Sequence, residues 1–339
     1  MNWLNASLWL VTGGIFCPCL TAQIPADTFP NAHVHYNFVL EAFNEIGDAA
    51  DAYLAFSVHS EDSSAIAAQL QILKGKIQKV RARVQGRPGY KKDQRIRQGL
   101  LDLLEIYEEV FEDRVFTVET PGTREQKYAR QEIQYAWQRV AEEKMANARN
   151  EFLILRMNFA RDHRIKRRTV PISYVHARIN ELMDYCHLIE WARVRVVRQH
   201  AGFLDAMEAE DSALMKARRW DLLEVSSHAY NEVAAMPNFR GEYAYRSAAL
   251  NLFRFYRELA AQDLPSWIML VSLGSGTTRD GGETDAKAEE ARLNAYTHAI
   301  ELRNASVSRY NKRMPPLRDR YFSQRKRLQR KYVPRNLGK

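Results

Sequence analysis

The chain has 339 residues, of which 46% are hydrophobic and 27% charged, and it contains only 15 Gly and 11 Pro. This composition excludes a disordered chain, and so few turn residues argue against a β-rich fold. The formal net charge of +9 is concentrated at one end, because residues 317–339 carry nine Lys or Arg and one acid. The rest of the chain is nearly neutral and long enough for about two domains.

Residues 1–22 have no charged side chain, are apolar or small from Ala6 to Leu20, and end in Leu20-Thr21-Ala22. We expect an export signal peptide cut after Ala22, which would place the protein in the periplasm, on the cell surface or outside the cell. An uncleaved anchor is the alternative, but glycines and a proline interrupt the run. No other segment approaches transmembrane length. Of the three cysteines, Cys186 alone lies beyond the signal, and we expect it to be a small buried hydrophobe.

Beyond a short linker, apolar residues recur with the 3.6-residue period of amphipathic helices. The first, third and fourth predicted helices cover residues 33–59, 90–118 and 123–166, with Pro121-Gly122 between the last two. The second begins after Asp62, which we expect to be its N-cap, and continues to Gly86 and Pro88. On one face of the fourth we place Ile133, Trp137, Val140, Ala141, Met145, Ala148 and Phe152.

A break at Thr169-Val170-Pro171 separates these helices from four more, predicted over residues 173–203, 208–235, 242–262 and 283–313. A glycine-rich loop at 274–282 precedes the eighth helix, and we expect Pro315-Pro316 to end it.

Two stretches 149 positions apart resemble each other. Pro88-Gly89-Tyr90-Lys91 corresponds to Pro237-Asn238-Phe239-Arg240, and the following helix repeats Arg97, Leu101, Leu103 and Tyr107 as Arg246, Leu250, Leu252 and Tyr256. Self-similarity at a fixed distance indicates a supersecondary unit used twice. We therefore predict an all-α fold of two tandem antiparallel four-helix-bundle-like units from an internal duplication, over residues 23–168 and 169–316, followed by a basic C-terminal tail at 317–339.

The repeated polar pairs are the first candidate site. Arg97, Tyr107, Arg246 and Tyr256 could bind a ligand in a groove between the two units, because clefts between domains are favoured binding sites. The alternative is structural: a buried Tyr with a hydrogen-bonded hydroxyl and an Arg whose stem packs along the bundle both serve a core.

Metal and catalytic patterns are weak. His33 and His35 point away from each other on a helix. Asp184, His187 and Glu190 share a face, but a bundle di-iron site needs two Glu-x-x-His motifs, so we interpret them as a charged outer face. Glu224 and His228 occur as one isolated pair. We expect no metal, no cofactor and no catalytic residue, since no Gly-x-Ser-x-Gly, His-Glu-x-x-His or Cys-x-x-Cys-His motif is present.

The basic tail interleaves aromatic residues with cations. In an exported protein the available polyanions are envelope components rather than nucleic acid, and cations contribute near an anionic surface. The tail's candidate contact residues for such a cell-envelope component are Arg325, Lys326, Arg327, Arg330 and Lys331. The alternative is a solvated extension of the last helix.

Leu20-Thr21-Ala22-Gln23, the 33–59 opening helix and the paired turns at Pro88 and Pro237 together resemble the uncharacterised exported all-helical protein family of bacterial cell envelopes. The resemblance implies location and fold and brings no catalytic residue. We therefore expect an exported cell-envelope protein with a non-enzymatic binding or structural role. The alternative is a metal- or haem-binding helical bundle, or an enzyme of the periplasm.

Overall fold

The structure is a computed structural model that describes residues 29–113, 122–166, 174–274 and 286–337. These residues form an all-α protein without strands. The helices are α1 (Ala32–His59), α2 (Ser63–Gln85), α3 (Arg95–Asp113), α4 (Arg124–Asp162), α5 (Tyr174–Glu208), α6 (Ser212–Ala235), α7 (Ala244–Glu258), the π-helix η1 (Leu259–Asp263), α8 (Leu264–Gly274) and α9 (Ala286–Tyr332). The expected signal peptide, Pro121, the break at 169–171 and residues 275–282 of the glycine-rich loop lie outside the described residues.

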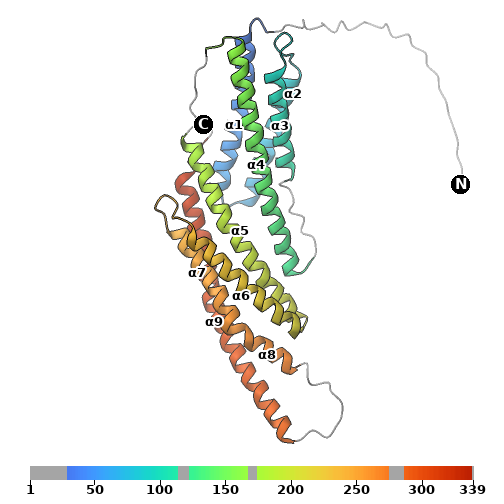
Figure 1. Cartoon of the computed structure of the whole chain (residues 1–339), viewed down its shortest axis with the longest axis vertical. Helices are drawn as coiled ribbons and strands as arrows, with labels where there is room; N and C mark the ends of the chain where they lie inside the picture. Colours follow the sequence, from blue (N-terminus) through green and yellow to red (C-terminus); the bar gives the residue numbers. More distant parts are fainter. Residues whose placement is uncertain (1–28, 114–121, 167–173, 275–285, 338–339) are drawn as a thin grey trace, which may run out of the picture.

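Two groups of helices follow one another along the long axis of the molecule, α1 to α4 in one and α5 to α9 in the other (Figure 1). Each group has its own cluster of buried apolar residues, which is why both can form. Leu73, Ile77, Leu100, Leu104 and Phe152 are among the first, and Leu182, Phe203, Leu222, Phe253 and Tyr321 among the second. Cys186 belongs to the second core, as predicted, and burial raises the pKa of its thiol to about 12. No helix in the described ranges combines the length and apolar character needed to cross a membrane.

The helix starts follow local capping chemistry. The side chain of Asp62 accepts hydrogen bonds from the amides of Ser64 and Ala65 at the start of α2, as the sequence predicts. Thr123 and Gln126 form a capping box at the start of α4. Both satisfy amides that have no partner inside the helix.

The eighth predicted helix does not end at Pro315-Pro316. Both prolines lie inside α9, which continues to Tyr332. Proline removes an amide donor, but these two are exposed, so water can reach the carbonyls they leave unpaired. Beyond them Tyr321, Leu328 and Val333 are buried in the second core, and this packing offsets the cost of the prolines. Most of the predicted basic tail is thus the last part of α9, which packs one side against the second core.

The seventh predicted helix is also longer than expected, because α7, η1 and α8 are continuous from Ala244 to Gly274. Pro265 cannot donate to the helical ladder, and the π-turn lies directly before it. The carbonyl of Ala260 accepts a 2.7 Å hydrogen bond from Arg219 Nε instead. The π-turn and Arg219 together let the helix pass a residue that would otherwise end it.

The two turns that the sequence pairs share part of their backbone conformation. Lys91 and Arg240 both have positive φ, 54° and 49°, but Gly241 also has a positive φ, 83°, whereas Lys92 does not. Tyr90 bridges to Asp93 in the first turn, and Phe239 bridges to Glu242 in the second.

Candidate functional site

The repeated arginines cap helices. Arg97 donates to the carbonyls of Val84, Gln85 and Arg87 at the end of α2, at 3.2, 2.9 and 2.6 Å. Arg246 donates in the same way to Val233 and Ala234 at the end of α6. A cation at a helix C-terminus satisfies orphan carbonyls and opposes the helix dipole. This role explains why both stretches contain an arginine here.

The repeated tyrosines occupy different environments. Tyr256 is fully buried in the second core, where burial raises the pKa of its hydroxyl. Tyr107 is half-buried in the first unit, its pKa also raised by burial, and it lines a cavity with Arg149. Among these four described residues no contact joins the pair of one unit to the pair of the other, so the structure does not bring them together in a shared groove.

The histidine and carboxylate candidates do not converge either. His33 is exposed, whereas His35 is buried against Phe29 and Phe159, so the two rings do point apart. Glu224 is exposed, and His228 pairs with Glu232. Nowhere in the described ranges do three His, Cys, Asp or Glu side chains gather closely enough to hold a metal ion.

The predicted outer face of α5 is wrong for Glu190. Asp184 is exposed, and His187 packs against Tyr135, but Glu190 is only 1% exposed. Spacing along a helix shows that charged residues share a face, but not whether that face meets solvent. Glu190 faces Arg193 on the same helix and Arg325 on α9.

Glu190 is the centre of a buried polar cluster formed by α4, α5, α7 and α9. Its Oε1 accepts from Arg193 Nε and Nη2 at 2.8 and 2.6 Å, and its Oε2 accepts from the Tyr321 hydroxyl at 2.6 Å. Arg325 Nη1 lies 3.2 Å from Oε2, and Tyr245 lies 2.9 Å from Tyr321, oxygen to oxygen. The Tyr135 hydroxyl of α4 also donates to Oε1, at 3.3 Å, so the cluster joins the helices of the second unit to one another and to α4 of the first.

Burial by itself would raise the pKa of Glu190, but Arg325 and Arg193 outweigh it and hold that pKa below its ordinary value. The carboxylate is therefore ionised in the core, and its hydrogen-bonding capacity is used by protein donors. It stabilises the fold rather than offering a reactive group.

The five basic residues proposed to contact a polyanion lie on α9, and four have acidic partners within the protein. Arg325 faces Glu190, Lys326 and Arg330 both pair with Glu61 at 3.1 Å, and Lys331 pairs with Glu242. Arg327 is exposed. The charge of this segment thus serves mainly to attach α9 to its neighbours.

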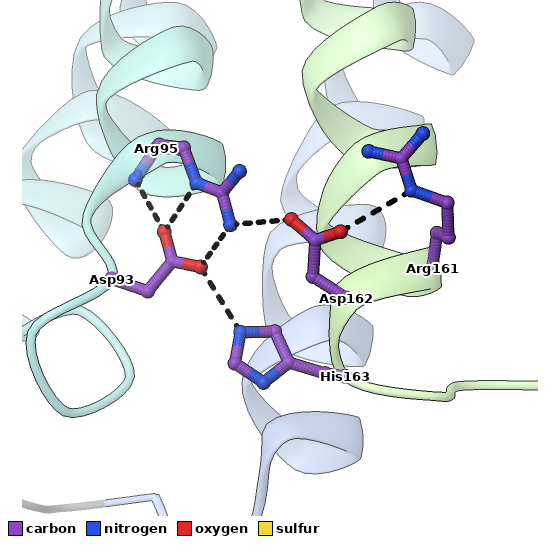
Figure 2. A network of polar contacts seen from close by, with 5 residues as sticks. All are labelled: Asp93, Arg95, Arg161, Asp162 and His163. Atoms are coloured by element: carbon purple, nitrogen blue, oxygen red, sulfur yellow. Dashed lines mark hydrogen bonds and ion pairs between the residues drawn. The ribbon is translucent and has the colours of Figure 1, made fainter.

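A second polar network joins the start of α3 to the end of α4 (Figure 2). Arg95 donates from Nε and Nη2 to the two oxygens of Asp93 at 2.9 and 2.7 Å, and its Nη2 also lies 3.0 Å from Asp162. His163 Nε2 lies 3.0 Å from Asp93 Oδ2. The hydrogen bond from Arg95 is the main reason that the pKa of Asp93 is lowered. The network therefore holds the start of α3 against the end of α4 in the first unit.

In the described part of the chain, α4 has an apolar face that is exposed. Ile133, Trp137 and Val140 are 62%, 54% and 60% exposed, although the sequence placed them with the core-facing residues. Ala141, Ala148 and Phe152 of that same set are buried. We name Ile133, Trp137 and Val140 the α4 apolar stripe.

The stripe is exposed because α4 is much longer than α3. Glu109, near the end of α3, pairs with Lys144, so the part of α4 before Lys144 extends beyond α3 (Figure 1). That part packs on α5 through residues such as Tyr135 and Glu132. The described α3 has 19 residues and α4 has 39, whereas the sequence predicted a third helix over 90–118, so the predicted helix lengths did not reveal this exposed part of α4.

Exposed cations lie at the two ends of the stripe. Arg130 is one turn before Ile133 and Lys144 is one turn after Val140, and Lys144 pairs with Glu109. Arg139 is two positions after Trp137 and projects from a different side of the helix. Three apolar side chains at helical spacing with a cation at each end fit a helix that contacts an anionic interface.

No family model, curated protein or solved structure matches this chain.

Proposed function

We propose that this chain is an exported, non-enzymatic protein of the bacterial cell envelope that associates with an anionic lipid surface through the α4 apolar stripe. The export assignment comes from residues 1–22 of the sequence. The binding role is supported by one observation above all: Trp137 is more than half exposed between Ile133 and Val140, on a helix face with Arg130 and Lys144 at its ends.

The chemistry of this face suits the headgroup boundary of a membrane. Indole is amphipathic and favours that boundary, and Ile133 and Val140 can enter the adjoining acyl region. Each nearby Lys or Arg contributes about 1 kcal/mol close to an anionic surface. We place the site here rather than on residues 317–339, where four of the five candidate cations have acidic partners within the protein. Of the two cations at the ends of the α4 apolar stripe, Lys144 is likewise paired, with Glu109.

We also propose that the two units arose by duplication. The positive φ shared by Lys91 and Arg240 and the matching caps by Arg97 and Arg246 support this proposal. Duplication would explain a scaffold with two separate cores.

The first testable prediction concerns Trp137. We expect the purified chain to bind vesicles containing phosphatidylglycerol, with Trp137→Ala weakening the partition roughly tenfold through lost apolar burial. Trp220→Ala is the matched control, since Trp220 is 59% exposed on α6 and stacks with Arg219. Sedimentation with vesicles measures both variants, and binding should fall as salt rises.

Equal partition of the Trp137→Ala and Trp220→Ala variants would contradict the proposal. Equal binding to neutral phosphatidylcholine vesicles would also contradict it, because the cations beside the stripe would then have no effect on binding. If the chain did not bind vesicles but was retained on envelope proteins from which lipid had been extracted, the partner would be a protein and not a lipid surface.

A further inference from the structure

The first unit contains a cavity that the membrane proposal does not use. It has a volume of about 60 Å³ and lies between α1 and α3. Leu100 and Leu104 form part of an apolar wall, Gly47 and Ala50 form another part, and Tyr107 and Arg149 bring polar groups to it. At about 15 Å³ for each water-sized occupant, the space holds roughly four such atoms.

Small residues on α1 create this space. A Cβ added at Gly47 would meet no atom within 4 Å. Glycine in the middle of a helix lowers helix stability relative to alanine by about 0.5–1 kcal/mol. Its presence at this place in α1 is therefore unfavourable for the helix itself, and what it provides is room.

The second unit fills the corresponding space. Buried apolar residues of α1 recur on α5 at a spacing of 150 positions, where Val39, Ala42 and Ile46 correspond to Ile189, Ala192 and Val196. The same spacing places Val197 opposite Gly47 and His200 opposite Ala50. The His200 ring lies 5.3 Å from the ring of Tyr256, the residue that corresponds to Tyr107. Larger side chains thus occupy in one unit what is open in the other.

The polar groups at the cavity define the ligand. The Arg149 side chain is exposed, and its guanidinium lies 5.9 Å from the centre of the Phe43 ring and makes no ion pair with a described residue. Asp51 also lines the cavity and already has a partner. The Tyr107 hydroxyl forms no hydrogen bond within the described ranges. An available guanidinium and a hydroxyl beside a small apolar space suit a carboxylate with a short hydrocarbon tail.

We propose that the cavity binds a short-chain monocarboxylate, with about four carbons beside Gly47 and Ala50 and the carboxylate at Arg149 and Tyr107. This inference goes beyond the proposed membrane role and does not depend on it. Binding would be in the millimolar range, as expected for so small a ligand.

The test is an NMR titration of the purified chain with pentanoate. We expect saturable shifts, loss of at least tenfold in affinity for Gly47→Val and for Ala50→His, and wild-type affinity for Gly75→Val. Gly75 is the matched control because a Cβ there also meets no atom within 4 Å, yet it lies on α2 outside the cavity lining. Arg149→Gln should weaken pentanoate but leave binding of 1-pentanol unchanged.

Thermal unfolding of each variant establishes that it is folded before its affinity is compared. Wild-type affinity in a folded Gly47→Val variant would overturn the proposal. Acetate binding as well as pentanoate would overturn it too, because the apolar space would then contribute nothing. Absence of saturable pentanoate binding to the wild-type chain has the same consequence.

Discussion

His35 shows how one buried side chain can set the pH dependence of stability. The ring is 1% exposed, and neither ring nitrogen has a hydrogen-bonding partner among the residues that the structure describes. Burial lowers the pKa of His35 to about 4, with Asp93 opposing this shift and Arg97 and His163 adding to it. An uncharged imidazole is therefore compatible with the fold and a charged one is not.

We predict that the free energy of unfolding falls as pH decreases from about 6.5 toward 4. In that window the unfolded chain, whose histidine has an ordinary pKa, binds a proton that folded His35 does not. His35→Phe should keep the aromatic packing with Phe29 and Phe159, raise stability near neutral pH by about 1 kcal/mol, and reduce the slope. Urea unfolding at several pH values measures both effects.

Part of the slope remains in that variant, because His200 is also fully buried with its pKa lowered to about 4. A slope unchanged by His35→Phe between pH 4 and 6.5 would show that His35 is protonated in the folded protein.

At the scale of elements, the repeated arginines are predicted to be structural caps. Arg246→Ala should lower the free energy of unfolding by about 2 kcal/mol, because the last carbonyls of α6 lose their charged donor. Arg246→Lys should recover only part of this stability, since an ammonium lacks the forked guanidinium that donates to two carbonyls at once. Denaturant unfolding measures the two variants. Wild-type stability of the alanine variant would contradict capping and restore a ligand role.

Helix existence was predictable here, but some helix ends and faces were not. The 3.6-residue period located each helical region, and Asp62 marked a start correctly. Pro315 and Pro316 mislead because proline reports only a local cost, whereas the packing of Tyr321 that offsets this cost involves distant segments. Glu190 was misplaced for the same reason, as Arg325 lies far from it in sequence.

The α4 apolar stripe shows the complementary limit. Ile133 and Phe152 both fit the apolar pattern of one long helix, yet only Phe152 is buried, because period does not say how far a neighbouring helix extends. The third helix was predicted over 90–118, so its predicted length did not distinguish them, whereas the 19 residues of the observed α3 do.

At the scale of the whole molecule, the two cores imply different sensitivities to loss of the C-terminal segment. All buried residues of the first core lie between Tyr36 and Ala160. The second core takes Tyr321, Leu328, Val333 and Leu337 from beyond Pro316, as well as Ala55 and Val58 from α1. The first unit should therefore tolerate removal of the C-terminal segment, and the second should not.

We predict that ending the chain at Pro316 unfolds the second unit while the first persists. Large buried side chains contribute about 2–5 kcal/mol each, so losing several exceeds the total stability of an ordinary domain. The loss also leaves Glu190 without Arg325. Limited proteolysis should then yield a resistant fragment within residues 29–166, whereas the intact chain should be resistant over both units.

A matched pair of leucines on α9 tests the same point without truncation. Leu328 is buried in the second core, and Leu293 is 63% exposed on the same helix. Leu328→Ala should lower the free energy of unfolding by about 3 kcal/mol, and Leu293→Ala should change it by less than about 0.5 kcal/mol. If the truncated chain and the Leu328→Ala variant both melted like the wild type, residues 317–337 would be a solvated extension, and their cations would again be available to an external polyanion.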